Sequence, residues 1–131
     1  HAVKRAGPLL GKRVLVTGSG PIGILTIIAA KAAGAAEIVA TDVVDGPLPT
    51  ALKMGACRAI NVLAEPDSLK AEYGAEKGAF DVMFEASGNQ HALTGAFDVV
   101  RSGGVIVQIG VGGNFTLPMN VVVAKEFDLR G

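Results

Sequence analysis

Three glycines that follow a short apolar run have the spacing of a phosphate-binding turn. Gly18, Gly20 and Gly23 form the pattern G-x-G-x-x-G directly after the run Val14–Val16. Gly18 permits a tight turn, Gly20 lets a pyrophosphate approach the backbone without meeting a Cβ, and Gly23 lets the next helix pack close to the strand. The pattern therefore predicts a strand, a turn and a helix that together hold the phosphates of a dinucleotide.

The residues between the last two glycines are suited to the start of a helix. Pro21 and Ile22 would occupy its first turn, where the missing N–H of proline costs little. The unpaired N–H groups and the partial positive charge of a helix N-terminus favour a bound anion. No Gly-Lys-Ser/Thr triplet follows the turn, which argues against a Walker-type nucleoside triphosphate site.

One acidic residue stands where a dinucleotide-binding fold needs it. Asp42 closes the second apolar run and lies about 20 residues beyond the turn, where its carboxylate can accept hydrogen bonds from both hydroxyls of the adenosine ribose. A glycine-rich turn alone can be purely structural. The order strand, turn, helix, strand and acid favours dinucleotide binding over that interpretation. A methyltransferase also places an acid after a glycine loop, but Gly23 argues against it.

Six short apolar runs recur at a regular interval of about 20–25 residues, which holds one strand, one helix and two loops. Most are continuous rather than alternating, as in strands that are buried on both faces. We therefore expect a doubly wound Rossmann sheet of six parallel strands in the order 3-2-1-4-5-6, in a three-layer α/β domain that spans residues 1–131. The runs are Val14–Val16, Ile38–Ala40, Ala59–Val62, Val82–Phe84, Val105–Val107 and Phe127–Leu129.

The segments between these runs have helix-forming residues and glycine or proline boundaries. Five helices are predicted on this basis, over residues 22–33, 49–54, 67–72, 89–100 and 120–125.

Composition excludes several classes of protein. Half of the 131 residues are hydrophobic and 18% are charged, so the chain can bury a core. Twelve basic and twelve acidic residues cancel, which does not suit a nucleic-acid binder, and no apolar run is long enough to span a membrane. The single cysteine, Cys57, fits a reducing, cytoplasmic location. With only His1 and His91 besides, a zinc site of Cys and His ligands is not expected in this chain.

Three further residues have modest expected roles. His91 is predicted to decorate the first turn of a helix, and Cys57 to pack as a small buried residue beside the third strand. Glu85 ends the fourth strand among apolar residues, and a buried carboxylate needs partners. We expect it to tie a loop to a backbone amide rather than to contact a cofactor.

Several segments resemble the zinc-containing medium-chain dehydrogenases, in particular the polyol and sugar-acid enzymes of the sorbitol dehydrogenase type. The resemblance implies the NAD-binding domain of a two-domain enzyme that oxidises a secondary alcohol to a ketone. The zinc ligands of that family lie in a catalytic domain that no part of this chain matches. No catalytic residue or metal ligand is therefore expected here, and no activity of this domain alone. The segments are His1–Gly7, Val14–Gly23, Gly55-Ala56, Phe80–Val82, Phe84–Gly88 and Gly103-Gly104.

The resemblance also assigns cofactor contacts along the chain. They are the pyrophosphate turn, the ribose acid with the residue that flanks the adenine, a loop beside the adenosine, and a segment that borders the nicotinamide. In this sequence they are Gly18, Gly20, Pro21, Ile22 and Gly23; Asp42 and Val43; Ala86 and Ser87; and Ile109, Gly110 and Val111. Five residues after the acid, where many relatives carry Arg or Lys, this chain has Pro47.

The same resemblance implies a small polyol or sugar-acid substrate and a homodimer that pairs through the sixth strand, expected over Glu126–Arg130. Two alternatives share the fold. A zinc-free, NADPH-dependent quinone reductase is disfavoured by Asp42, because a carboxylate repels a 2′-phosphate. A non-catalytic NAD-sensing module would differ only in the domains that accompany it.

Overall fold

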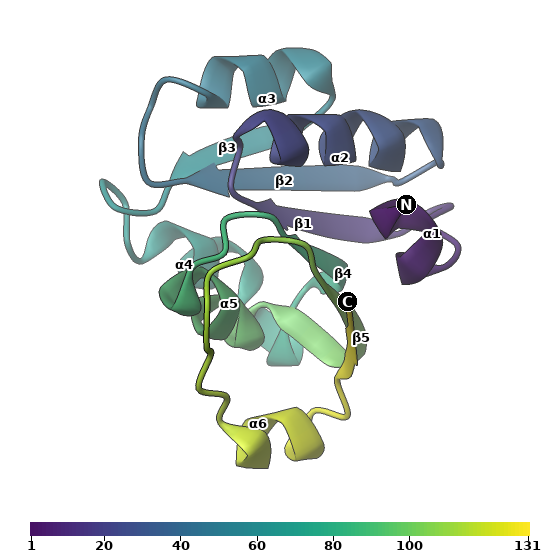
Figure 1. The fold of residues 1–131 in the computed structure, drawn as a ribbon, viewed down its shortest axis with the longest axis vertical. Coiled ribbons are helices and arrows are strands. Elements are labelled where there is room, and N and C mark those ends of the chain that lie inside the picture. The colour runs from purple at the N-terminus through teal and green to yellow at the C-terminus, as the bar shows by residue number, and fades with distance from the viewer.

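The computed structural model describes residues 1–131 and contains one parallel sheet of six strands in the order β3-β2-β1-β4-β5-β6 (Figure 1). This confirms the predicted topology. The chain adds strands outward from β1 in one direction as far as β3, and then in the other direction from β4 to β6, with all strands parallel. The strands are β1 (Arg13–Thr17), β2 (Glu37–Asp42), β3 (Arg58–Asn61), β4 (Phe80–Glu85), β5 (Val100–Gln108) and β6 (Asp128–Arg130).

Helices cover both faces of the sheet. Figure 1 shows α2 and α3 on one side, and α4, α5 and α6 on the other. The helices are α1 (Ala2–Ala6), α2 (Pro21–Ala32), α3 (Leu48–Met54), α4 (Ser68–Tyr73), α5 (Gln90–Gly95) and α6 (Met119–Ala124), with short 3-10 turns η1 (Ala75–Lys77) and η2 (Ala96–Asp98). Helix α1 was not predicted from the sequence.

The core has two halves because side chains of a strand alternate between its faces. Val14 and Val16 pack with α2 and α3 residues such as Ile27, whereas Leu15 packs on the opposite face with residues of α4 to α6. All three β1 side chains are fully buried. A strand that is buried on both faces needs an apolar residue at every position, which explains the continuous apolar runs. Packing on both faces also holds the carboxyl ends of the strands in place.

The predicted helix over residues 89–100 was wrong in its second half. Helix α5 ends at Gly95, one 3-10 turn follows, and β5 already begins at Val100, which pairs with Phe80. Val99 and Val100 are fully buried. Their β-branched side chains favour an extended backbone that packs in the core, and this overrides the helical pattern.

Two smaller expectations were also wrong. The sixth strand begins at Asp128 rather than Glu126, because Glu126 has a φ of 53°, which no strand residue adopts. Cys57 is exposed rather than packed. His91 does decorate the first turn of α5, where its own N–H is bonded to the Asn89 side chain, 2.8 Å away. None of the helices has the length and apolar character that a membrane crossing requires.

Candidate functional site: the carboxyl edge of the sheet

The turn between β1 and α2 is held in place by two of its glycines. Gly18 has a φ of 86°, and a Cβ there would lie 2.8 Å from the backbone nitrogen of Ser87. A Cβ at Gly23 would lie only 1.8 Å from the carbonyl oxygen of Gly18. The tight turn and the close packing of α2 therefore both require glycine, as predicted for these positions.

Gly20 faces open space. A Cβ at this position would meet nothing within 4 Å, and its φ of −69° is one that any residue can adopt. Helix α2 begins at Pro21 without a side-chain cap, so the N–H groups of Ile22 and Gly23 have no helical carbonyl to bond. The exposed turn thus offers donors and room for an anion, which is the arrangement that a pyrophosphate needs.

Asp42 lies beside this turn and has a role that the sequence analysis missed. Its Oδ2 accepts a hydrogen bond from the N–H of Ser19 at 2.8 Å, and its Oδ1 accepts from the N–H groups of Val43 at 2.7 Å and Val44 at 3.2 Å. Ser19 is buried and donates its hydroxyl to the Thr41 carbonyl. The carboxylate therefore connects the turn between β1 and α2 to the end of β2, and it remains partly exposed.

The ends of β4 and β5 complete the same edge. The N–H of Ala86 donates to the carbonyl of Thr17 at 2.8 Å, so the loop after β4 starts directly beside the phosphate turn. The N–H groups of Ile109 and Gly110 both donate to the carbonyl of Glu85, at 2.8 Å each. The structure thus brings the predicted segments 18–23, 42–43, 86–87 and 109–111 to one edge of the sheet. Among these residues, Val43 is 54% exposed and Val111 is 100% exposed.

Glu85 itself is fully buried at this edge. Its carboxylate accepts hydrogen bonds from the backbone and side chain of Ser87, from the N–H of Gly88, and from Gln108. This confirms the expected structural role. No sequence pattern pointed to Gln108, whereas its position as a single acidic residue at the end of an apolar strand did mark Glu85.

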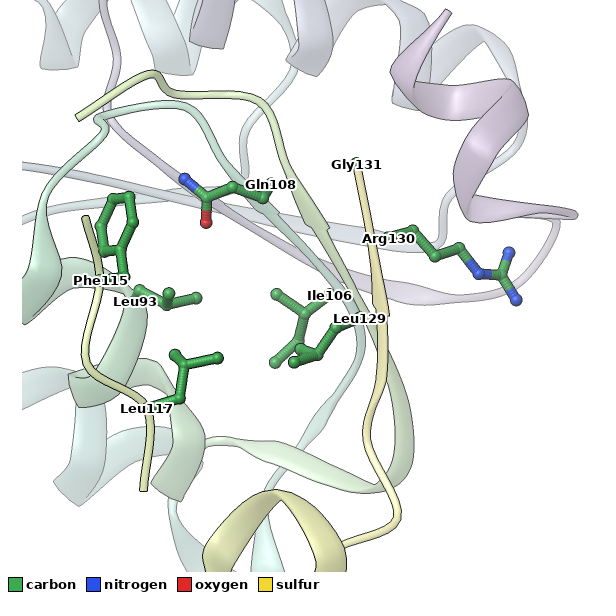
Figure 2. Close-up of a pocket in the computed structure, with 8 residues that line it drawn as sticks. All are labelled: Leu93, Ile106, Gln108, Phe115, Leu117, Leu129, Arg130 and Gly131. Carbon is green, nitrogen blue, oxygen red and sulfur yellow. The ribbon is translucent and has the colours of Figure 1, made fainter. Parts of the chain in front are cut away.

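A cavity of about 280 Å³ lies elsewhere, between β5, β6, α5 and the segment that leads to α6 (Figure 2). It contains none of the residues predicted to hold a cofactor. Gln108 borders it with its amide oxygen, which has no hydrogen-bond partner. The cavity is otherwise mainly apolar; it is lined by Leu93, Ile106, Gln108, Phe115, Leu117, Leu129, Arg130 and Gly131.

The chain offers no place for a zinc ion. No three His, Cys, Asp or Glu side chains lie close enough together to hold a metal. The residues present therefore do not fit the metal of the medium-chain dehydrogenases, and no chemistry of this chain is assigned to it.

Comparison with known proteins identifies the family. A family model described as zinc-binding dehydrogenase matches residues 21–131. The chain belongs to the zinc-binding dehydrogenase family. Within that family, the chain has the NAD(P)-binding fold.

Two curated zinc-binding dehydrogenase relatives match the whole chain. It is 44% identical to the L-idonate 5-dehydrogenase (NAD(P)(+)) of Escherichia coli and 39% identical to the sorbitol dehydrogenase of Gallus gallus. In each case the match covers 100% of this chain and 38% of the relative. The chain thus spans well under half the length of these relatives.

Solved structures agree with this assignment. The crystal structure of the Escherichia coli L-idonate 5-dehydrogenase matches with a TM-score of 0.93 over 100% of this chain and 37% of that one. A Sinorhizobium meliloti protein solved bound to NADP matches with a TM-score of 0.89 at 25% identity, over 100% of this chain and 40% of that one. The observed strand order is therefore that of a dehydrogenase cofactor domain.

Proposed function

We propose that this chain binds NAD and orients its nicotinamide within an enzyme that oxidises a secondary alcohol of a small polyol or sugar acid to a ketone. The observation that carries the proposal is the open Gly20 turn at the N-terminus of α2, with the Asp42 carboxylate beside it. The similarity to L-idonate 5-dehydrogenase and sorbitol dehydrogenase supports the substrate class.

When bound, NAD accepts a hydride from the alcohol carbon. The chain's own residues bind and position the cofactor. The N–H groups of Ile22 and Gly23 would donate to the pyrophosphate across the open face of Gly20. Asp42 would accept from the ribose hydroxyls, with Val43 against the adenine. The segment 86–87 would border the adenosine, and the segment 109–111 the nicotinamide, at the edge where open parallel sheets bind ligands.

Charge near the ribose favours NAD over NADP. Asp42 stands at the end of β2, and Asp45 of the same loop is held by Asn61 at 2.7 Å. Val43, Val44 and Pro47 are uncharged, and Pro47 serves as the cap before α3. A 2′-phosphate would meet the Asp42 carboxylate, and none of these three neighbours carries a positive charge to offset it. Together with the lost ribose bonds, this repulsion is expected to cost about 3 kcal/mol, more than a hundredfold in affinity.

Calorimetric titration of both cofactors tests this proposal. The unaltered chain should bind NAD more than about a hundredfold more tightly than NADP. Asp42→Ser should weaken NAD binding and reduce the difference in affinity between NAD and NADP, because it removes the ribose acceptor and the repulsive charge together. Asp45→Asn is the matched control, since it removes a charge from the same loop but not the proposed ribose contact. Equal affinity of the unaltered chain for NAD and NADP would show that Asp42 does not reach the ribose.

The remaining features of the proposal concern the whole enzyme. Zinc would be held by residues outside this chain, and a homodimer would form through the free edge of β6. A cytoplasmic location is proposed from the single unpaired cysteine.

A further inference from the structure

Glu85 is a carboxylate buried without a cation. It ends the central strand β4 with 0% exposure, and no lysine, arginine or histidine forms an ion pair with it. A charge in such a place persists only if hydrogen-bond donors replace the lost water. The backbone N–H groups of Ser87 and Gly88 lie 2.8 and 2.9 Å from its oxygens, and the amide nitrogen of Gln108 lies at 2.6 Å.

These donors come from different strand ends. Thr17, the last residue of β1, donates its hydroxyl to Oε1 at 3.3 Å. Ser87 and Gly88 follow β4, and Gln108 ends β5. The main-chain carbonyl of Glu85 also accepts the N–H groups of the segment 109–110. One residue therefore fastens the phosphate turn, the loop after β4 and the loop after β5 to one another.

The last two loops are packed too closely to tolerate a change in their separation. A Cβ at Gly110 would lie 2.1 Å from the backbone nitrogen of Gly88 and 2.8 Å from Oε2 of Glu85. A Cβ at Gly112 would lie 1.7 Å from the Gly88 carbonyl oxygen. The segment 109–112 thus rests on Gly88, whose own position is set by the Glu85 carboxylate.

The phosphate turn and the ribose acid also have contacts of their own. Asp42 holds the N–H of Ser19, and the N–H of Gly18 donates to the Thr41 carbonyl at 2.9 Å. Neither contact involves Glu85. Asp42 therefore holds the ribose side of the edge, whereas Glu85 holds the loop after β4, which includes Ser87, and through Gly88 the segment 109–111.

We infer that Glu85 is a positioning residue for the nicotinamide half of the cofactor, which it orients through the segment 109–111 without touching it. This inference rests on the proposed function. It follows that removal of the charge should loosen the nicotinamide more than the pyrophosphate and the ribose, whose contacts through Gly18 and Ser19 do not involve Glu85.

Titrations with NAD and with ADP-ribose, which lacks only the nicotinamide, test this inference. Glu85→Gln should weaken NAD binding about tenfold and ADP-ribose binding less than about threefold, because one acceptor oxygen becomes an NH2 group that cannot accept a hydrogen bond and the other loses its charge. Bound NADH should also lose the enhanced emission of a rigidly held dihydronicotinamide. Asp81→Asn is the control: Asp81 lies at the other end of β4, where it accepts from the Arg13 N–H at 2.8 Å and from Arg101. It should leave both affinities unchanged.

The outcomes separate two kinds of failure. If the unaltered chain binds neither ligand, the proposed function is wrong and this inference with it. If it binds both, but Glu85→Gln weakens them equally or not at all, only the inference is overturned. If Glu85→Gln does not fold, Gln108→Met decides, since it removes the amide that links Glu85 to the carbonyl of Gly110 and keeps the side-chain volume. An NAD affinity reduced about threefold, with ADP-ribose unchanged, would support the inference, and an unchanged NAD affinity would overturn it.

Discussion

Gly20 and Gly23 belong to one turn but have different physical reasons to be glycine. A Cβ on Gly23 would collide with a main-chain oxygen of the same turn, which cannot move without displacing α2. A Cβ on Gly20 would project into solvent, where the chain itself needs no glycine. The fold therefore explains the glycine at position 23 but not the one at position 20, where the proposed pyrophosphate would lie.

This contrast gives a paired prediction. Gly23→Ala should lower the free energy of unfolding by about 1–3 kcal/mol, because the added methyl overpacks the turn. Gly20→Ala should change it by less than about 1 kcal/mol, since its backbone angles suit alanine. Gly20→Ala should nevertheless weaken NAD binding more than about tenfold, because the methyl would occupy the place of the pyrophosphate. Thermal unfolding and calorimetry measure the two effects, and unaltered NAD affinity of Gly20→Ala would contradict the proposed phosphate site.

At the scale of elements, Lys125 joins the end of α6 to the segment between α5 and β5. Its amine donates to the carbonyls of Phe97 at 2.6 Å and Val100, and lies 5.2 Å from the centre of the Phe127 ring. Phe97 lies in the 3-10 turn η2 and Val100 begins β5, so both carbonyls lie where the sequence predicts a longer helix. Burial lowers the pKa of Lys125, an effect that nearby Asp98 partly opposes.

Lys125→Met should destabilise the chain by about 1–2 kcal/mol, because two partly buried carbonyls lose their donor. The effect should depend on pH. Since the pKa is lower in the folded chain, the unfolded chain binds more protons between the two pKa values, and the stability of the unaltered chain should rise with pH toward 10.5. Loss of the proton does not break these contacts, because the neutral amine still has two N–H groups that can donate to the two carbonyls.

Denaturant unfolding at pH 7 and pH 10 measures this difference. Lys70→Met is the matched control, because Lys70 pairs with Asp98 at 2.9 Å on the exposed surface and should contribute less than about 1 kcal/mol. If the difference in free energy of unfolding between the unaltered chain and Lys125→Met does not grow over this pH range, burial does not lower the pKa of Lys125.

At the scale of the whole molecule, the sheet ends in an unprotected edge. Strand β6 pairs with β5 on one side only, and Leu129 at its centre is 40% exposed. A free edge of this kind presents unpaired N–H and C=O groups to a second chain. Arg130 is held by the carbonyl of Arg5 at 2.6 Å, which anchors the short strand to the rest of the chain.

We expect the chain to dimerise through this edge at micromolar to millimolar concentration. Leu129→Lys should shift it toward the monomer, because a charge on an edge strand opposes pairing. Leu10→Lys, at a position that is 81% exposed and outside the sheet, is the control and should leave the association unchanged. Sedimentation velocity over a concentration series measures both. A monomer at the highest concentration, or equal effects of the two variants, would contradict the expected interface.

The sequence by itself determined the layers, the strand order and the glycine turn after β1. These features depend on local patterns: continuous apolar runs at a regular interval, and glycines whose spacing suits a tight turn. The acid at the end of β2 could be found in the same way, because the motif fixes its approximate distance along the chain.

Other features were decided only by tertiary structure, because they depend on neighbours that are distant in sequence. The end of α5 is set by the burial of Val99 and Val100. The second role of Asp42 arises because the turn at Ser19 lies beside β2. The donors around Glu85 come from residues 17, 87, 88 and 108, which meet only because parallel strands bring their carboxyl ends to one edge.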